Sequence, residues 1–216
     1  MKIGFDNDKY LAMQSAHIRE RIAQFDNKLY LEFGGKLFDD YHASRVLPGF
    51  QPDSKLQMLL RGQNVLGYSH YPDDFVRMFV RKSVENGIDI IRIFDALNDI
   101  RNIEVAVDET LKCGAHASGC ICYTISPIHN LESYVKLAKE IEALGVQSIC
   151  VKDMAGIMSP KEAYDLVTAL KKEIKVPIVI HTHNTTGLGP MTLMKAVEAG
   201  ADVIDTAVSC FSGGTS

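Results

Sequence analysis

Three residues of the sequence carry side chains that could bind one cation. His181 and His183 stand at positions i and i+2, at the end of the apolar run 176–180. In an extended strand such residues point to the same side, so both imidazoles could reach one ion. Neutral imidazole suits zinc and its first-row neighbours. Lys152 ends a second apolar run, 148–151, and it could act as an oxygen ligand if its amine took up carbon dioxide and became a carbamate.

Each of these residues also has a plainer interpretation. A His-x-His pair is more often incidental than a metal site, and a lysine at a strand end is usually a salt-bridge or surface group. The elements around them favour a shared site, because residues 146–187 read strand, turn, helix, strand, turn. Between the strands, Ser159, Pro160 and Glu162 form a capping box with proline at the first helical position. This pattern predicts a βαβ unit with two parallel, buried strands, and ligands collect at the carboxyl ends of such strands.

The same alternation of strand and helix continues along the chain. Strands are expected over 88–94, 117–125, 148–151, 176–180 and 202–208, and helices over 73–86, 103–111 and 131–144. Glycines that end helices recur at intervals typical of a (β/α)₈ barrel. We count about five barrel strands, whereas a complete barrel has eight. The predicted fold is therefore α/β, a partial TIM barrel of about five βα units over residues 55–216.

Residues 1–54 differ from the rest of the chain and are predicted to be a separate α/β segment. A helix is expected over 8–26 and a strand over 28–33, and a polar loop then carries Asp39, Asp40 and His42. These three residues could form a metal cluster, but acidic loop residues are usually just exposed. We interpret them as a solvated loop.

Composition narrows the function classes. A chain of 216 residues can bury one real core, and 46% of its residues are hydrophobic. The net charge of -4 argues against a nucleic-acid surface, so no nucleic-acid partner is expected. No apolar run is long enough for a membrane span, and the start does not read as a signal peptide. The five cysteines lack zinc or redox spacing, which indicates free thiols and a cytoplasmic location.

Two short sequence motifs carry a family resemblance, KDMAG at 152–156 and HTHNTTG at 181–187. They resemble the carboxyltransferase domain of the family that contains the oxaloacetate decarboxylase alpha subunit and pyruvate carboxylase, including its separate B subunit, over about residues 55–216. The resemblance implies that Lys152, as a carbamate, binds one divalent metal together with His181 and His183. Zinc is the expected ion, with manganese or cobalt as alternatives. Biotin would be supplied on a carrier domain elsewhere.

Further sequence motifs shared with the family imply roles for other site residues. In the RGQN word at 61–64, Arg61 would bind the carboxylate of pyruvate, which suits the planar fork of a guanidinium. Gln63 would take part in substrate binding, and Tyr68 matches a tyrosine near that pocket, although it could simply pack. Asp95 begins the DALND word at the carboxyl end of a strand and is assigned to the catalytic group.

The implied reaction is carboxyl transfer between carboxybiotin and pyruvate, or the reverse with oxaloacetate as donor. The resemblance also implies a biotin carboxyl carrier domain as partner, association with membrane decarboxylase subunits or biotin carboxylase, and a homo-oligomer in the full-length family. Two residues of the family are not found in the chain: an aspartate ligand in an RDAHQS-type word and a threonine that shuttles a proton. We therefore expect weak activity or none.

Residues 1–60 resemble a different family, the N-terminus of an unrelated uncharacterised bacterial protein of unknown function. The words GFDN, LYLEFGGKLFDD and RVLPGF carry this resemblance. We therefore expect a chimera, natural or from sequence assembly, with domains at 1–54 and 55–216.

Two alternatives remain open. One is an acyl-CoA lyase or synthase of the same barrel superfamily, which would carry a DT-G word where this chain has KDMAG. Lys152 and Met154 favour the carboxyltransferases. The other is a non-enzymatic fusion fragment, because a partial barrel exposes strand edges.

Overall fold

A computed structural model describes residues 55–207 of the chain. The chain divides into two units between Ser54 and Lys55, and the described residues belong to the second. The helix predicted over 8–26, the strand over 28–33, the polar loop with Asp39, Asp40 and His42, and the chain after residue 207 lie outside the described residues.

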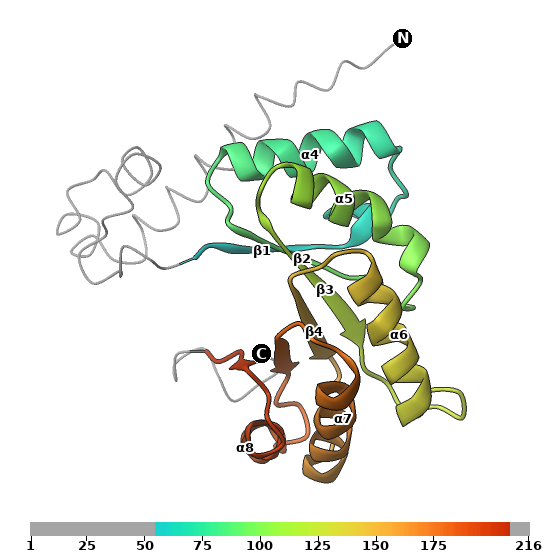
Figure 1. The fold of residues 1–216 in the computed structure, drawn as a ribbon, viewed down its shortest axis with the longest axis vertical. Coiled ribbons are helices and arrows are strands. Elements are labelled where there is room, and N and C mark those ends of the chain that lie inside the picture. The colour runs from blue at the N-terminus through green and yellow to red at the C-terminus, as the bar shows by residue number, and fades with distance from the viewer. Residues whose placement is uncertain (1–54, 208–216) are drawn as a thin grey trace, which may run out of the picture. The chain divides into compact units, whose positions relative to one another are not determined.

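The described residues form one sheet of six parallel strands in chain order (Figure 1). The strands are β1 (Gln57–Leu60), β2 (Ile90–Ile93), β3 (His116–Cys122), β4 (Ser148–Asp153), β5 (Ile178–Thr182) and β6 (Val203–Ile204). Every pair of neighbours is parallel. The count exceeds the prediction by one, because β1 forms in the stretch that sequence reasoning treated as the junction between two families.

A helix follows each strand from β1 to β5, which confirms the predicted βα rhythm. The helices are α4 (Asp73–Glu85), α5 (Glu104–Lys112), α6 (Leu131–Ala143), α7 (Pro160–Glu173) and α8 (Gly189–Glu198), with short 3-10 turns at Gly62–Asn64 and Ile100–Asn102. The capping box at the start of α7 is present: the Ser159 side chain accepts the Glu162 N–H, and the Glu162 side chain accepts the Ser159 N–H. Among the described residues, each helix is too short or too polar to cross a membrane.

The two faces of the sheet are packed differently. The apolar core lies between one face and the helices, and it includes Ile93, Ile121, Val151 and Ile180. Along each strand, the alternate residues point to the other face of the sheet. A small cluster on that face is formed by Phe94, Cys120, Cys122, Cys150 and Val179. In Figure 1 the helices run along the outer side of the curved sheet. The face with the cysteines is therefore the inner face.

A contact across the inner face requires the sheet to curl. Arg92 on β2 forms an ion pair with Asp205, which directly follows β6. Four strand spacings of about 4.8 Å would separate these strands by about 19 Å in a flat sheet, too far for an arginine and an aspartate to meet. The six strands therefore form an open half-barrel, and β1 and β6 are its edges within residues 55–207. The predicted partial TIM barrel is confirmed.

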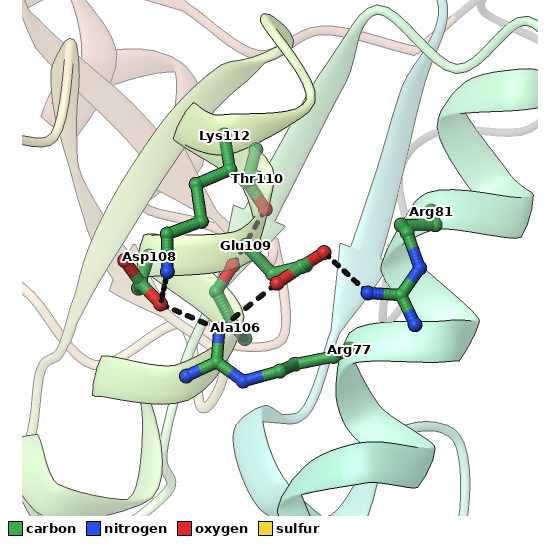
Figure 2. Close-up of polar contacts among 7 residues, drawn as sticks. All are labelled: Arg77, Arg81, Ala106, Asp108, Glu109, Thr110 and Lys112. Atoms are coloured by element: carbon green, nitrogen blue, oxygen red, sulfur yellow. Dashed lines mark hydrogen bonds and ion pairs between the residues drawn. The ribbon is translucent and has the colours of Figure 1, made fainter.

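An ionic network joins α4 to α5 on the outside of the sheet (Figure 2). Glu109 is buried and accepts hydrogen bonds from Arg77 at 2.9 Å and Arg81 at 2.8 Å. Asp108 accepts from Arg77 and from Lys112. Burial raises the pKa of the Glu109 carboxyl, but the hydrogen bonds from the two arginines outweigh burial and hold the pKa below its usual value. The network thus ties two helices together with a charged carboxylate.

Candidate metal and substrate site

The predicted site residues lie at one edge of the sheet. Because all strands are parallel, their carboxyl ends meet at the same edge. Arg61 directly follows β1, Asp95 comes two residues after β2, and Lys152 and His181 lie near the ends of β4 and β5. The structure confirms the predicted common edge.

Lys152, His181 and His183 are neighbours at this edge. Lys152 and His181 are register partners on neighbouring strands. The rings of His181 and His183 have centroids 5.2 Å apart and meet edge to face. The Lys152 side chain is buried, and its Nζ lies 4.9 Å from the centroid of the Phe94 ring, a cation–π contact.

These residues offer a donor set that could suit a metal. Within residues 55–207 no three His, Cys, Asp or Glu side chains are grouped to hold an ion. A site built on the two histidines requires a third ligand, and Lys152 could supply one after conversion to a carbamate. The burial of Lys152 beside His181 fits this requirement.

Asp153 organises the turn beside the two histidines, and sequence reasoning gave it no role. Its buried carboxylate accepts the N–H groups of Ile157 at 3.1 Å and Met158 at 2.9 Å, and the hydroxyl of Thr182 at 3.0 Å. Its carbonyl accepts the N–H of His183 at 3.0 Å. One residue therefore links the turn after β4 to the backbone of a predicted ligand. The available signal was a charged residue placed at the end of a buried strand.

Gly156 brings the KDMAG turn into contact with the HTHNTTG turn. Its φ is +65°, and a Cβ built on it would lie 2.4 Å from the carbonyl oxygen of His183. The Thr186 hydroxyl donates to the Gly156 carbonyl at 2.5 Å. Both the positive φ and the lack of room restrict this position to glycine. The two motifs that carry the family resemblance, KDMAG and HTHNTTG, are thus packed against each other.

Asp205 joins the group from the next strand, and sequence reasoning also missed it. Its Oδ2 lies 2.8 Å from Nδ1 of His181, and its Oδ1 accepts from Arg92 Nη2 at 3.2 Å. Burial raises the pKa of Asp205, but the hydrogen bonds from His181 and Arg92 prevail and lower it to about 2. The carboxyl is therefore ionised near neutral pH. Its position at the end of the run 202–205 was the signal in the sequence.

Arg61 and Tyr68 lie together on the same carboxyl edge, beside β1. The guanidinium carbon of Arg61 is 5.4 Å from the centroid of the Tyr68 ring, and Tyr68 is 94% exposed. Two strands, β2 and β3, separate β1 from the lysine strand β4. A shared pocket for Arg61, Tyr68 and Lys152 remains a prediction.

Gln63 and Asp95 serve local structure. Gln63 is buried, and its Nε2 donates to Oδ1 of Asp73 at 2.6 Å, at the start of α4. Its Oε1 is buried without a hydrogen-bond partner, and as an acceptor it could not bind a carboxylate. Asp95 accepts the N–H groups of Leu97 and Asp99, both at 2.9 Å, and the side chain of Asn102 at 3.1 Å. These contacts order the loop after β2, and the substrate and catalytic roles of both residues stay predictions.

Comparison with known protein families shows which families this chain belongs to. The model described as HMGL-like matches residues 86–214. The chain belongs to the HMGL-like family. By the same measure it also belongs to the family described as domain of unknown function DUF1846, N-terminal, which matches residues 3–115. The second match extends beyond residue 60, where the sequence resemblance was expected to end. The two matched ranges overlap over 86–115, so they do not place the change of family at one residue.

Individual relatives agree with the predicted resemblance. The HMGL-like chain is 56% identical to the B subunit of pyruvate carboxylase from Methanocaldococcus jannaschii over 82% of its own length and 31% of the relative. It is 51% identical to the methylmalonyl-CoA carboxyltransferase 5S subunit of Propionibacterium freudenreichii subsp. shermanii, over 82% of the chain and 35% of the relative. The carboxyl transferase domain of Rhizobium etli pyruvate carboxylase, solved with pyruvate, superposes with a TM-score of 0.75 and 43% identity, over 76% of this chain and 29% of that one.

The extent of these alignments bears on the domain boundary. The chain spans about a third of the length of the curated relatives named above. The alignment with the Methanocaldococcus relative covers 178 residues, more than residues 55–216 contain, so it also includes residues before Lys55. The structure divides the chain between residues 54 and 55, but a change of family at this point stays a prediction.

Proposed function

We propose that this chain carries a carboxyltransferase site that moves a carboxyl group between carboxybiotin and pyruvate, or from oxaloacetate in the reverse direction. One observation carries the proposal: Lys152 and His181 are register partners at the carboxyl edge, and the His183 ring lies 5.2 Å from that of His181. The relatives named as the pyruvate carboxylase B subunit and as carboxyltransferase support the same reaction class.

Each residue of the proposed site would have a separate task. Arg61 would bind the carboxylate of pyruvate through its guanidinium fork. Carbamylated Lys152, His181 and His183 would hold a divalent ion, with zinc favoured by the imidazoles and manganese or cobalt as alternatives. When bound, such an ion supplies charge that stabilises a developing oxyanion. Asp153 and Gly156 would keep the two turns in register, so that the ligands stay in place.

The proposed transfer exchanges a proton of pyruvate for the carboxyl group of carboxybiotin. The methyl carbon of pyruvate would lose a proton and form a bond to the carboxyl carbon, while the bond from that carbon to the biotin ring nitrogen breaks. The proton would end on the same ring nitrogen. Tyr68 and Asp95 are assigned to the catalytic group by resemblance, and Gln63 to substrate binding. We include them in the proposal as residues to be tested.

The proposal extends to partners and location. We propose that a biotin carboxyl carrier domain supplies the carboxyl group, that biotin carboxylase or membrane decarboxylase subunits associate with it, that the full-length family forms homo-oligomers, and that the chain is cytoplasmic. We also propose that the front segment, 1–54, comes from a different gene. Long-read sequencing of independent clones across the locus tests the last point, because one continuous frame in all clones would exclude an assembly error.

The reaction is tested by following oxaloacetate decarboxylation with free biotin on the purified full chain. The rate should depend on biotin and vanish in the Lys152→Ala variant. Lys161→Ala, on the exposed start of α7, is the control. Equal rates for the native chain and Lys152→Ala would contradict the proposal, and cleavage of acyl-CoA substrates would favour the lyase alternative.

A further inference from the structure

The ring of His181 is held from the neighbouring strand by Asp205. Asp205 Oδ2 lies 2.8 Å from His181 Nδ1, and the Asp205 N–H donates to the carbonyl of Ile180 at 2.9 Å. The carboxylate is therefore fixed to β5 through both its backbone and its side chain. About a quarter of the His181 and Asp205 side chains is exposed, so the pair is largely covered.

Arg92 fixes Asp205 from the far side of the half-barrel. The Arg92 side chain is 6% exposed, and both of its side-chain hydrogen bonds go to the oxygens of Asp205. A buried guanidinium is stabilised by an ionised partner with good geometry. Arg92 thus restrains the carboxylate in position and in charge.

The contact decides which nitrogen of His181 carries the proton. An ionised carboxylate can only accept hydrogen bonds, so the neutral imidazole must donate from Nδ1. Nε2 is then left with its lone pair, the form in which a histidine binds a metal. Both oxygens of Asp205 are already engaged by His181 and Arg92. Asp205 is therefore suited to act through His181 and not as a ligand itself.

We infer that Asp205, held by Arg92, is a positioning residue that keeps His181 in the Nδ1–H tautomer, with Nε2 free to bind a divalent ion. The inference rests on the proposed function, because it assumes that His181 is a ligand. It adds two residues that support the predicted ligand His181: Arg92 on β2 and Asp205 directly after β6. Partners of this kind typically change metal affinity by about 10–100-fold when they are removed.

Two readouts test this inference on the full chain. Long-range ¹H–¹⁵N NMR of the metal-free protein above neutral pH gives the tautomer, and the His181 signal is assigned with a His181→Asn variant. Zinc titration gives the affinity. The native chain should show the Nδ1–H tautomer, and Asp205→Ala should show mixed tautomers and zinc binding weaker by about 10–100-fold. Asp205→Asn should fall between them, because an amide oxygen can accept the same hydrogen bond without the charge.

The control is Asp165→Asn, which removes a carboxylate paired with Lys161 on the exposed face of α7 and should change neither readout. An Nε2–H tautomer in the native chain would overturn the inference, and it needs no variant to fold. Unchanged tautomer and affinity in Asp205→Ala would also overturn it. If the native chain binds no zinc, the proposed metal site fails, and the tautomer measurement still decides whether Asp205 positions His181.

Discussion

Replacing Gly156 by alanine should damage the site more than it damages the fold. A Cβ at this position would lie 2.4 Å from the carbonyl oxygen of His183, at a φ of +65°. Gly114 offers a matched control, because its φ is +73° and a Cβ there would meet nothing within 4 Å. The two variants share the backbone strain and differ in the clash with His183.

Backbone strain and the clash set the magnitudes. A positive φ costs an alanine about 1–2 kcal/mol, and this applies to both variants. In Gly156→Ala the His183 carbonyl must also move by about 1 Å to reach an ordinary contact, which strains the hydrogen bond between the His183 N–H and the Asp153 carbonyl. Weakening this hydrogen bond adds about 1 kcal/mol or more. We therefore expect losses of about 1–2 kcal/mol for Gly114→Ala and about 3 kcal/mol for Gly156→Ala.

Urea unfolding followed by circular dichroism measures the stability of both variants, and zinc titration measures the site. Metal ligands tolerate displacements of only about 0.2 Å, so a shift of about 1 Å at His183 should abolish tight binding in Gly156→Ala. Gly114→Ala should bind zinc as the native chain does. Equal stability of the two variants, or native zinc affinity in Gly156→Ala, would refute the packing described for the two turns.

Three further predictions concern the rest of the half-barrel. Glu109→Gln should lower the free energy of unfolding by about 1–3 kcal/mol at pH 7. Because the folded pKa of Glu109 is depressed, its contribution is fully present above its ordinary pKa of 4.5 and is lost as pH falls through the lower folded pKa, so the urea midpoints of variant and native chain should converge as the solution is acidified below pH 4.5. Arg61→Lys keeps the charge but loses the fork and should raise the KM for oxaloacetate about tenfold, whereas Arg101→Lys on the exposed loop should not. Ser159→Ala removes the cap of α7 and should cost about 1 kcal/mol in thermal unfolding without changing zinc affinity.

Features set by local pattern could be predicted from the sequence. The capping box at Ser159, the buried runs of β4 and β5, and the placement of Lys152 and His181 at one edge follow from periodicity and from the rule for parallel sheets. Strand β1 was missed because it spans only four residues and falls in the stretch that sequence reasoning treated as the junction between two families. The family resemblance then assigned chemistry to Gln63 and Asp95, for which the structure shows local hydrogen bonds.

Contacts that depend on the curvature of the sheet could not be predicted. Arg92 and Asp205 are 113 residues apart, and they meet only because six strands curl by enough to bring β2 toward β6. No local pattern encodes that closure. Asp153 was missed for a related reason. Its carboxylate oxygens accept hydrogen bonds from the turn after β4, and the geometry of that turn depends on the packing of Gly156 against His183.

The central claim, a metal site that uses Lys152 as a carbamate, is tested most directly by the zinc content of the purified full chain. The chain would be equilibrated with zinc with and without bicarbonate, desalted, and analysed for bound metal. We predict one ion per chain with bicarbonate, much less without it, and loss of the bicarbonate effect in Lys152→Ala but not in Lys161→Ala. A zinc content that is the same in the native chain and Lys152→Ala under both conditions would contradict the account.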